Sequence, residues 1–284
     1  MNRRIASVII AAALAASNGC TPSPPQQKPV IRVAVIGGMV MTGMWQELAK
    51  QFESNTEYRV QLVAAGPKPV LVDAVHKGEA DLLTMHSSDE ATDLVADGYA
   101  VDMRPWARNE LVIVGPPDDP VHIKGMTDGA AALRKIAEAH AAYVDFHDAG
   151  SRQIAARLWH KAGLEPQGDW VLKDESRIRQ EVVTFAEQHH AYVIVGRIPV
   201  LKGKMESGSM QILVEGDTEM RRPYVVMIAN AKRFPHANVR GAQALADYLT
   251  SGKGQRFLKD YAAKQPDGVP LFYPIDGNSG VNHP

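Results

Sequence analysis

The chain has 284 residues, with 31 Lys and Arg against 32 Asp and Glu and a single cysteine. A hydrophobic fraction of 45% and a charged fraction of 22% are those of a globular protein, which excludes a disordered chain, a collagen-like repeat and a disulfide-stapled miniprotein. The net charge of −1, with both signs interspersed, indicates no nucleic-acid surface. One cysteine allows neither a disulfide framework nor a cysteine-based zinc site, and we expect no metal or cofactor.

Residues 1–20 have the features of a secretory signal. Two arginines precede an apolar run at residues 5–16, which is too short to span a membrane. The small residues and Cys20 that follow resemble a bacterial lipoprotein signal, in which the cysteine is lipidated and becomes the new N-terminus. Residues 21–30 then form a Pro-rich tether. We therefore predict a periplasmic or cell-surface protein that Cys20 anchors to the membrane, with an uncleaved anchor or a conventional cleavage as alternatives.

From residue 31 onward, strand-like and helix-like segments alternate. In chain order we predict strand 31–36, helix 44–52, strand 59–64, helix 69–77, strand 80–85, helix 88–97, strand 111–115, helix 128–140, strand 142–146, helices 152–162 and 178–188, strands 191–195, 210–215 and 224–229, and helices 238–250 and 254–261. This alternation predicts an α/β fold with mostly parallel sheets. In such folds ligands bind at the loops beyond the carboxyl ends of the strands.

Two of these strands, 111–115 and 224–229, indicate a division into two lobes. They lie about 110 residues apart and are flanked by turns, as expected of two strands that cross between lobes. We predict lobe 1 from residues 31–112 and 225–276 and lobe 2 from residues 113–224, each with a mixed, mostly parallel sheet. The two crossing strands would form a hinge beside a cleft. A single continuous sheet without a moving cleft is the alternative.

The glycine turn after the first strand is a candidate anion site. Gly37 and Gly38 allow a ligand to approach the backbone, and Met39 follows them. Thr42 can cap the next helix. The Lys and Ser/Thr of a phosphate loop are absent, so nucleotide hydrolysis is not expected. A tight turn that only packs helix on strand explains the same residues.

A second candidate lies between the strand at 142–146 and the following helix. In this segment, which also holds Asp148, Ser151 would be the N-cap of the helix and Gly150 gives a ligand access, while Arg152 offers a planar guanidinium for an oxyanion. Other polar residues share the position at strand ends: His86, Ser87, Ser88, Arg108, Asn109, Ser176, Arg177 and Arg197. Each alone is equally typical of a solvated residue or a helix cap. Their shared position at strand ends makes them candidate ligands.

Motifs of catalysis are missing from the sequence. It has no serine between two glycines of a nucleophile elbow, no HExxH and no dinucleotide-binding fingerprint. We therefore assign no catalytic residue, and an enzyme is the least favoured class.

Several strings, among them GEADLLTMH at 78–86, VADGYAVD at 95–102, NELVIVGPPDDPVHIKGM at 109–126 and YLTSGKGQRFL at 248–258, resemble periplasmic tungstate-binding proteins of ABC transporters. The resemblance runs from Ile31 to Pro274. It implies a two-lobed, type II periplasmic-binding-protein fold. It also implies a monomer that delivers a small oxyanion of the tungstate or molybdate type to a membrane ABC permease.

The ligand motifs of that family are altered here. The hydroxyl-bearing stretch Thr-Thr-Thr-Ser corresponds to residues 35–38, which carry no hydroxyl, and the second motif, at residues 145–151, lacks the family's arginine. Arg197 matches an arginine of the family. Either Arg152, Arg177 and Arg197 rebuild an anion site with the glycine amides, or the cleft accepts a different small organic anion or solute. An envelope protein that contacts a partner without transport is the remaining alternative.

Overall fold

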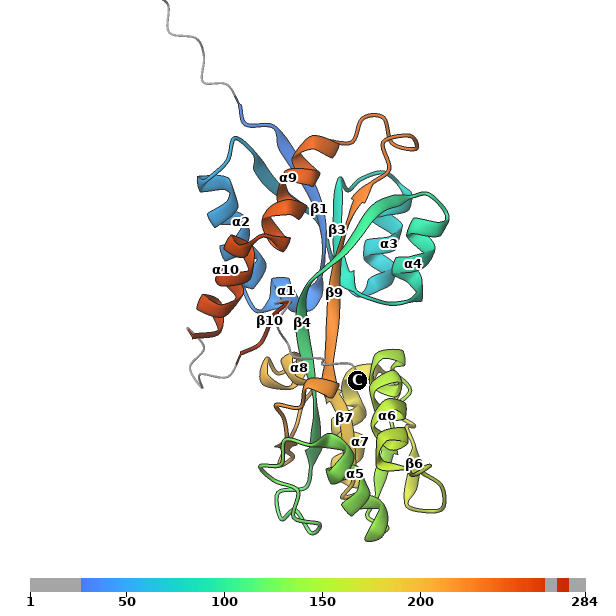
Figure 1. Ribbon diagram of the computed structural model, residues 1–284. Coiled ribbons are helices and arrows are strands. Elements are labelled where there is room, and N and C mark those ends of the chain that lie inside the picture. The colour runs from blue at the N-terminus through green and yellow to red at the C-terminus, as the bar shows by residue number, and fades with distance from the viewer. Residues whose placement is uncertain (1–26, 264–269, 276–284) are drawn as a thin grey trace, which may run out of the picture.

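The computed structural model describes residues 27–263 and 270–275. The predicted signal, Cys20 and most of the predicted tether lie outside these residues. Within the described residues, none of the helices combines the length and the apolar composition that a membrane span requires. We call residues 30–110, 221–263 and 270–275 the upper half and residues 111–220 the lower half (Figure 1).

The upper half is built from the first part of the chain and from its end. Its elements are β1 (Val30–Ile36), α1 (Gly37–Met41), α2 (Met44–Ser54), β2 (Arg59–Gly66), α3 (Lys68–His76), β3 (Leu82–His86), α4 (Asp89–Ala96), most of β4 (Ala100–Gly115), β9 (Arg221–Ala229), α9 (Val239–Thr250), α10 (Gly252–Ala263) and β10 (Tyr273–Pro274). The strands β1, β2 and β3 pair in parallel, and β9 pairs antiparallel with β3 and β4.

The lower half is formed by one continuous stretch of chain. Its elements are α5 (Gly129–Glu138), β5 (Tyr143–Asp145), α6 (Ala149–Ala162), β6 (Val171–Lys173), the 3₁₀ helix η1 (Arg179–Glu181), α7 (Val182–Gln188), β7 (Tyr192–Gly196), α8 (Arg197–Leu201), β8 (Gln211–Val214) and the 3₁₀ helix η2 (Thr218–Met220). Here β5 pairs in parallel with β6 and β7.

Strand β4 belongs to both halves. Its residues from Ala100 to Glu110 pair with β9, and those from Leu111 to Val114 pair with β7. The hydrogen-bonded strand order is therefore continuous, β2-β1-β3-β9-β4-β7-β5-β6. Figure 1 shows β4 and β9 running side by side toward the place where the halves meet. The predicted α/β fold with mixed sheets is confirmed.

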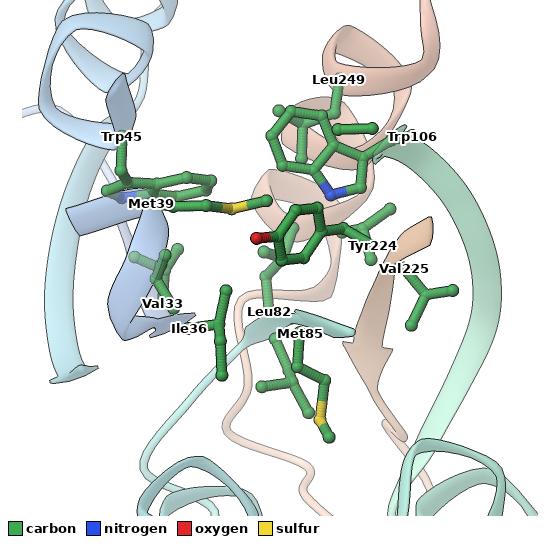
Figure 2. Close-up of a cluster of buried hydrophobic side chains, with 14 of the residues drawn as sticks. Val33, Ile36, Met39, Trp45, Leu82, Met85, Trp106, Tyr224, Val225 and Leu249 are labelled. Carbon is green, nitrogen blue, oxygen red and sulfur yellow. The ribbon is translucent and has the colours of Figure 1, made fainter. Parts of the chain in front are cut away.

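Separate hydrophobic cores stabilise the two halves. The upper core gathers large side chains from β1, α2, β4 and β9, including Trp45, Trp106 and Tyr224 (Figure 2). In the lower half, alternate residues of β4 point to opposite faces of the sheet. Leu111 and Ile113 belong to one buried cluster, whereas Val112 and Val114 belong to the other. Helices thus cover both faces of the lower sheet.

The largest difference from the predicted elements is β4, which begins 11 residues before the predicted strand at 111–115. Its first part reads as polar, because several of its side chains are exposed, and it includes Pro105. The ladder with β9 accommodates this segment through register shifts between Val101 and Arg104 and between Pro105 and Ala107. Such irregularities hide a strand from alternation patterns.

Candidate functional site

A cluster of polar and aromatic side chains lies where β3, β4 and β9 approach the lower half. We call His86, Asn109, Arg222 and Tyr224 the junction cluster. The sheet register sets His86 opposite Tyr224 and Asn109 opposite Arg222. The His86 ring stacks on the Tyr224 ring with centroids 4.2 Å apart, and its Nε2 lies 3.2 Å from Asn109 Oδ1. Three adjacent strands therefore place these four residues together.

His86 is held neutral in this cluster. Burial lowers the pKa of the His86 imidazole well below 6.5, and the Arg222 guanidinium lowers it further, while the hydrogen bond with Asn109 opposes the change. Lys68 and Arg179 also act on His86 in the same direction as Arg222. Because an amide oxygen only accepts, the neutral ring donates Nε2–H to Asn109 Oδ1. The amide nitrogen of Asn109 has no hydrogen-bond partner within the described residues.

Arg222 reaches from β9 of the upper half to the N-terminus of α6 in the lower half. A Cβ atom on Gly150 would overlap the guanidinium of Arg222, so any other residue at position 150 would displace the guanidinium from this place. Burial lowers the pKa of Arg222, and Asp148 opposes this effect. Throughout residues 27–263 and 270–275, the Arg222 guanidinium forms neither an ion pair nor a hydrogen bond.

The N-terminus of α6 is capped by Asp148 and not, as predicted, by Ser151, which lies inside the first turn of the helix. Its Oδ1 accepts hydrogen bonds from the amides of Gly150 and Ser151, both at 3.1 Å, and its Oδ2 lies 2.8 Å from Arg179 Nε. Asp148 therefore serves the helix and neutralises Arg179. The Ser151 side chain is buried at the same helix end.

Three cations and two carboxylates act on the junction cluster among the described residues. Lys68 Nζ pairs with Glu90 Oε2 at 3.0 Å, Arg179 pairs with Asp148, and Arg222 is left over. The surroundings of His86 therefore carry a net charge of about +1 when the imidazole is neutral. Such a place attracts an anion.

The predicted glycine turn lies beside this cluster. A Cβ on Gly38 would be 3.8 Å from the Tyr224 hydroxyl, and Gly37 packs against the backbone of Gly66. Figure 2 shows the Tyr224 hydroxyl pointing toward the segment that holds Ile36 and Met39. The Met39 side chain itself is fully buried in the upper core. Thr42 does not cap α2 as predicted, because Gly43 is the N-cap of that helix; instead the Thr42 hydroxyl donates to the carbonyls of Gly38 and Met39 at the end of α1.

The other predicted site residues are dispersed. Arg152 pairs with Asp145 at 3.0 Å, and both side chains are about half exposed. Arg197 is 3% exposed, with its Nε 2.7 Å from Glu215 Oε2. Arg177 and Ser87 are exposed, although the Ser87 amide donates to the Pro223 carbonyl.

A groove of about 810 Å³ lies between α6 and the strands β5 and β6. Its lining includes Tyr143, Asp145, Arg152 and Trp159, and it shares no residue with the junction cluster. The cations that act on His86 are likewise absent from its lining.

Three residues that form or act on the junction cluster, Arg222, Tyr224 and Lys68, are not among the candidates from the sequence. The available signal was the pair Arg221 and Arg222 directly before a strand that was predicted to cross between lobes. Because a strand that crosses between lobes begins where the lobes meet, a charged pair at its start lies close to both. The predicted strand begins at residue 224, whereas β9 begins at Arg221 and includes the pair.

Comparisons with known proteins show what the chain as a whole is similar to. A family model described as bacterial extracellular solute-binding protein matches residues 31–262. The tungstate-binding protein TupA of Peptoclostridium acidaminophilum is 28% identical, over 96% of this chain and 98% of that protein. Among solved structures, TupA from Desulfovibrio alaskensis G20 has a TM-score of 0.69 and 25% identity, over 87% of this chain and 98% of that one. The tungstate ABC transporter structure from Geobacter sulfurreducens has a TM-score of 0.66 and 27% identity, over 82% and 98%.

Proposed function

The chain belongs to the bacterial extracellular solute-binding protein family, and from that premise we propose that it binds a small oxyanion of the tungstate type and delivers it to a membrane ABC permease. The predicted resemblance to tungstate-binding proteins is confirmed by the relatives and solved structures. That this chain binds the same ligand as those proteins is our proposal.

The net positive charge around His86 is the observation that carries this proposal. A doubly charged oxyanion that leaves water must gain cationic partners and hydrogen-bond donors. Arg222 supplies a charge without a carboxylate partner, and the Asn109 amide and the Tyr224 hydroxyl supply donors. The described structure gathers these groups where the halves meet, as a ligand enclosed by both halves requires.

We propose that the predicted lobes, residues 31–112 with 225–276 and residues 113–224, close over the ligand. Strands β4 and β9 would act as the hinge, since β4 pairs in both halves and β9 begins at their junction. The protein would be a monomer held at the periplasmic or cell-surface side by lipid on Cys20. Replacement of Cys20 by alanine would then move the protein from the membrane fraction to the soluble fraction.

The experiment is a thermal-shift series on the purified protein with tungstate, molybdate, sulfate, phosphate and small carboxylates, followed by calorimetry. A ligand at about 1,000 times its Kd adds roughly 4 kcal/mol to the stability of the folded state, which is readily measured. We expect tungstate and molybdate to raise the Tm most. A shift with carboxylates alone would replace the oxyanion by an organic anion, and no shift with any anion would contradict the proposal.

A further inference from the structure

We propose that Arg222 is the charge-compensating ligand residue of this protein and that it makes the site selective for doubly charged over singly charged tetrahedral oxyanions. This inference rests on the proposed function and names the residue that sets its specificity. The arginine that compensates the charge of the anion would then come from β9 of the upper half and not from the N-terminal turn of α6.

The first argument is the placement of the guanidinium. Arg222 lies at the start of β9, opposite Asn109 on the strand that both halves share, and its side chain covers Gly150 in the first turn of α6. Gly150 has an ordinary helical backbone, so the backbone conformation does not require glycine there. Glycine is needed if the Arg222 guanidinium is to lie here, because the guanidinium occupies the space that a side chain at position 150 would take. The sequence of α6 is thus fitted to an arginine from another strand.

The second argument is that the positive charge of Arg222 is available to a ligand. Lys68 and Arg179, the other two cations that act on His86, have the carboxylates of Glu90 and Asp148, and Arg152 has that of Asp145. Arg222 has none within the described residues, although burial withdraws it partly from water. An uncompensated, partly desolvated guanidinium is unfavourable in the empty protein. A bound anion would relieve that cost.

The third argument is the absence of competing charge in the junction cluster. His86 is neutral because burial and the nearby cations lower its pKa, and burial raises the pKa of the Tyr224 phenol. The amides of Gly150 and Ser151 are occupied by Asp148. Of the three cations that act on His86, Arg222 is therefore the one whose charge a ligand can meet without displacing a carboxylate. Its planar fork suits two oxygens of a tetrahedral oxyanion.

The test compares tungstate with perrhenate, two tetrahedral oxyanions of similar size that differ by one negative charge. Calorimetry on the full-length protein measures both affinities for the parent protein and for Arg222→Gln, Arg222→Lys and Gly150→Ala. Arg157→Gln is the matched control, because Arg157 lies on α6 and pairs with Glu219, which is not a member of the junction cluster. Circular dichroism and the Tm without anion establish that each variant is folded.

We expect Arg222→Gln to weaken tungstate binding about 100-fold and to reduce the preference for tungstate over perrhenate about 10-fold, since a hydrogen bond to a charged partner is lost. Arg222→Lys restores part of the affinity, as it keeps the charge without the fork. Gly150→Ala weakens binding although every charge is retained, because the methyl group displaces the guanidinium. Arg157→Gln binds as the parent protein does.

Two results are distinguished by this design. If the parent protein binds tungstate and Arg222→Gln binds it with the same affinity and selectivity, the assignment of Arg222 is wrong and the proposed function stands. If the parent protein binds no oxyanion, the proposed function is wrong and the assignment falls with it.

Discussion

Two arginines near the junction of the halves differ in what neutralises them. Arg197, the first residue of α8, is almost fully buried, with its Nε 2.7 Å from Glu215 Oε2 and its Nη1 3.4 Å from the Pro270 carbonyl oxygen. Arg222, at the start of β9, has no such partner within the described residues. Both arginines lie near the junction, but only Arg197 has a carboxylate partner among the residues that the structure describes. We therefore infer that Arg197 stabilises the fold and that Arg222 is available to a ligand.

The strongest test of this comparison is stability. We expect Arg197→Met to lower the free energy of unfolding by about 2 kcal/mol, because the buried hydrogen bonds of the guanidinium are lost while Glu215 stays partly solvated. Arg222→Met is expected not to lower it, since the change removes a partly buried charge without a partner. Urea unfolding without anion measures both. Equal losses in the two variants would remove the distinction between the arginines.

A smaller effect concerns the pH dependence of stability through His86. In the unfolded chain His86 takes up a proton near pH 6.5, whereas in the folded protein its pKa lies well below that value. The unfolded state therefore binds more protons as the pH falls below about 6.5, and stability declines. We expect unfolding free energies between pH 8 and 5 to decline more steeply for the parent protein than for His86→Gln.

The same series also reports on Arg222. Because the Arg222 charge lowers the pKa of His86, Arg222→Met should raise that pKa and make the decline shallower. Parallel profiles for the parent protein and Arg222→Met would show that the guanidinium does not act on His86.

The smallest expected effect is that of Arg152. Its ion pair with Asp145 is about half exposed, and such pairs contribute about 0.5 kcal/mol or less. Arg152→Gln should therefore leave both the urea midpoint and the tungstate affinity nearly unchanged. A large loss of affinity would return Arg152 to the ligand site and would weaken the case for Arg222.

The succession of elements could be predicted because it depends on local periodicity. Helix α2 begins at Met44 as expected, and β2 begins at Arg59. The first part of β4 escaped detection because its partners on β9 lie more than 100 residues away and absorb its irregular register. The first part of β4 is a strand because it pairs with β9, and such long-range pairing leaves no periodic pattern in the local sequence.

The same limit applies to the candidate site. Asp148, Gly150 and His86 were selected because they follow strands, and the structure places all three around the junction. Which arginine keeps a free charge depends on the positions of Glu215 and Asp145, which no local pattern reveals. The assignment of ligand residues from sequence stays a prediction, and the choice between Arg197 and Arg222 required the fold.

The order of the elements also bears on how the chain acquires its structure. The lower cores use only residues between Leu111 and Met220, whereas the upper core combines β1–β3 with side chains as late as Phe272. Long-range pairing is slow, and unpaired strands are prone to aggregation. In a chain that emerges N-terminus first, the earliest strands wait for the last helices. We expect the lower half to fold first and the nascent upper strands to depend on chaperones until the C-terminus arrives.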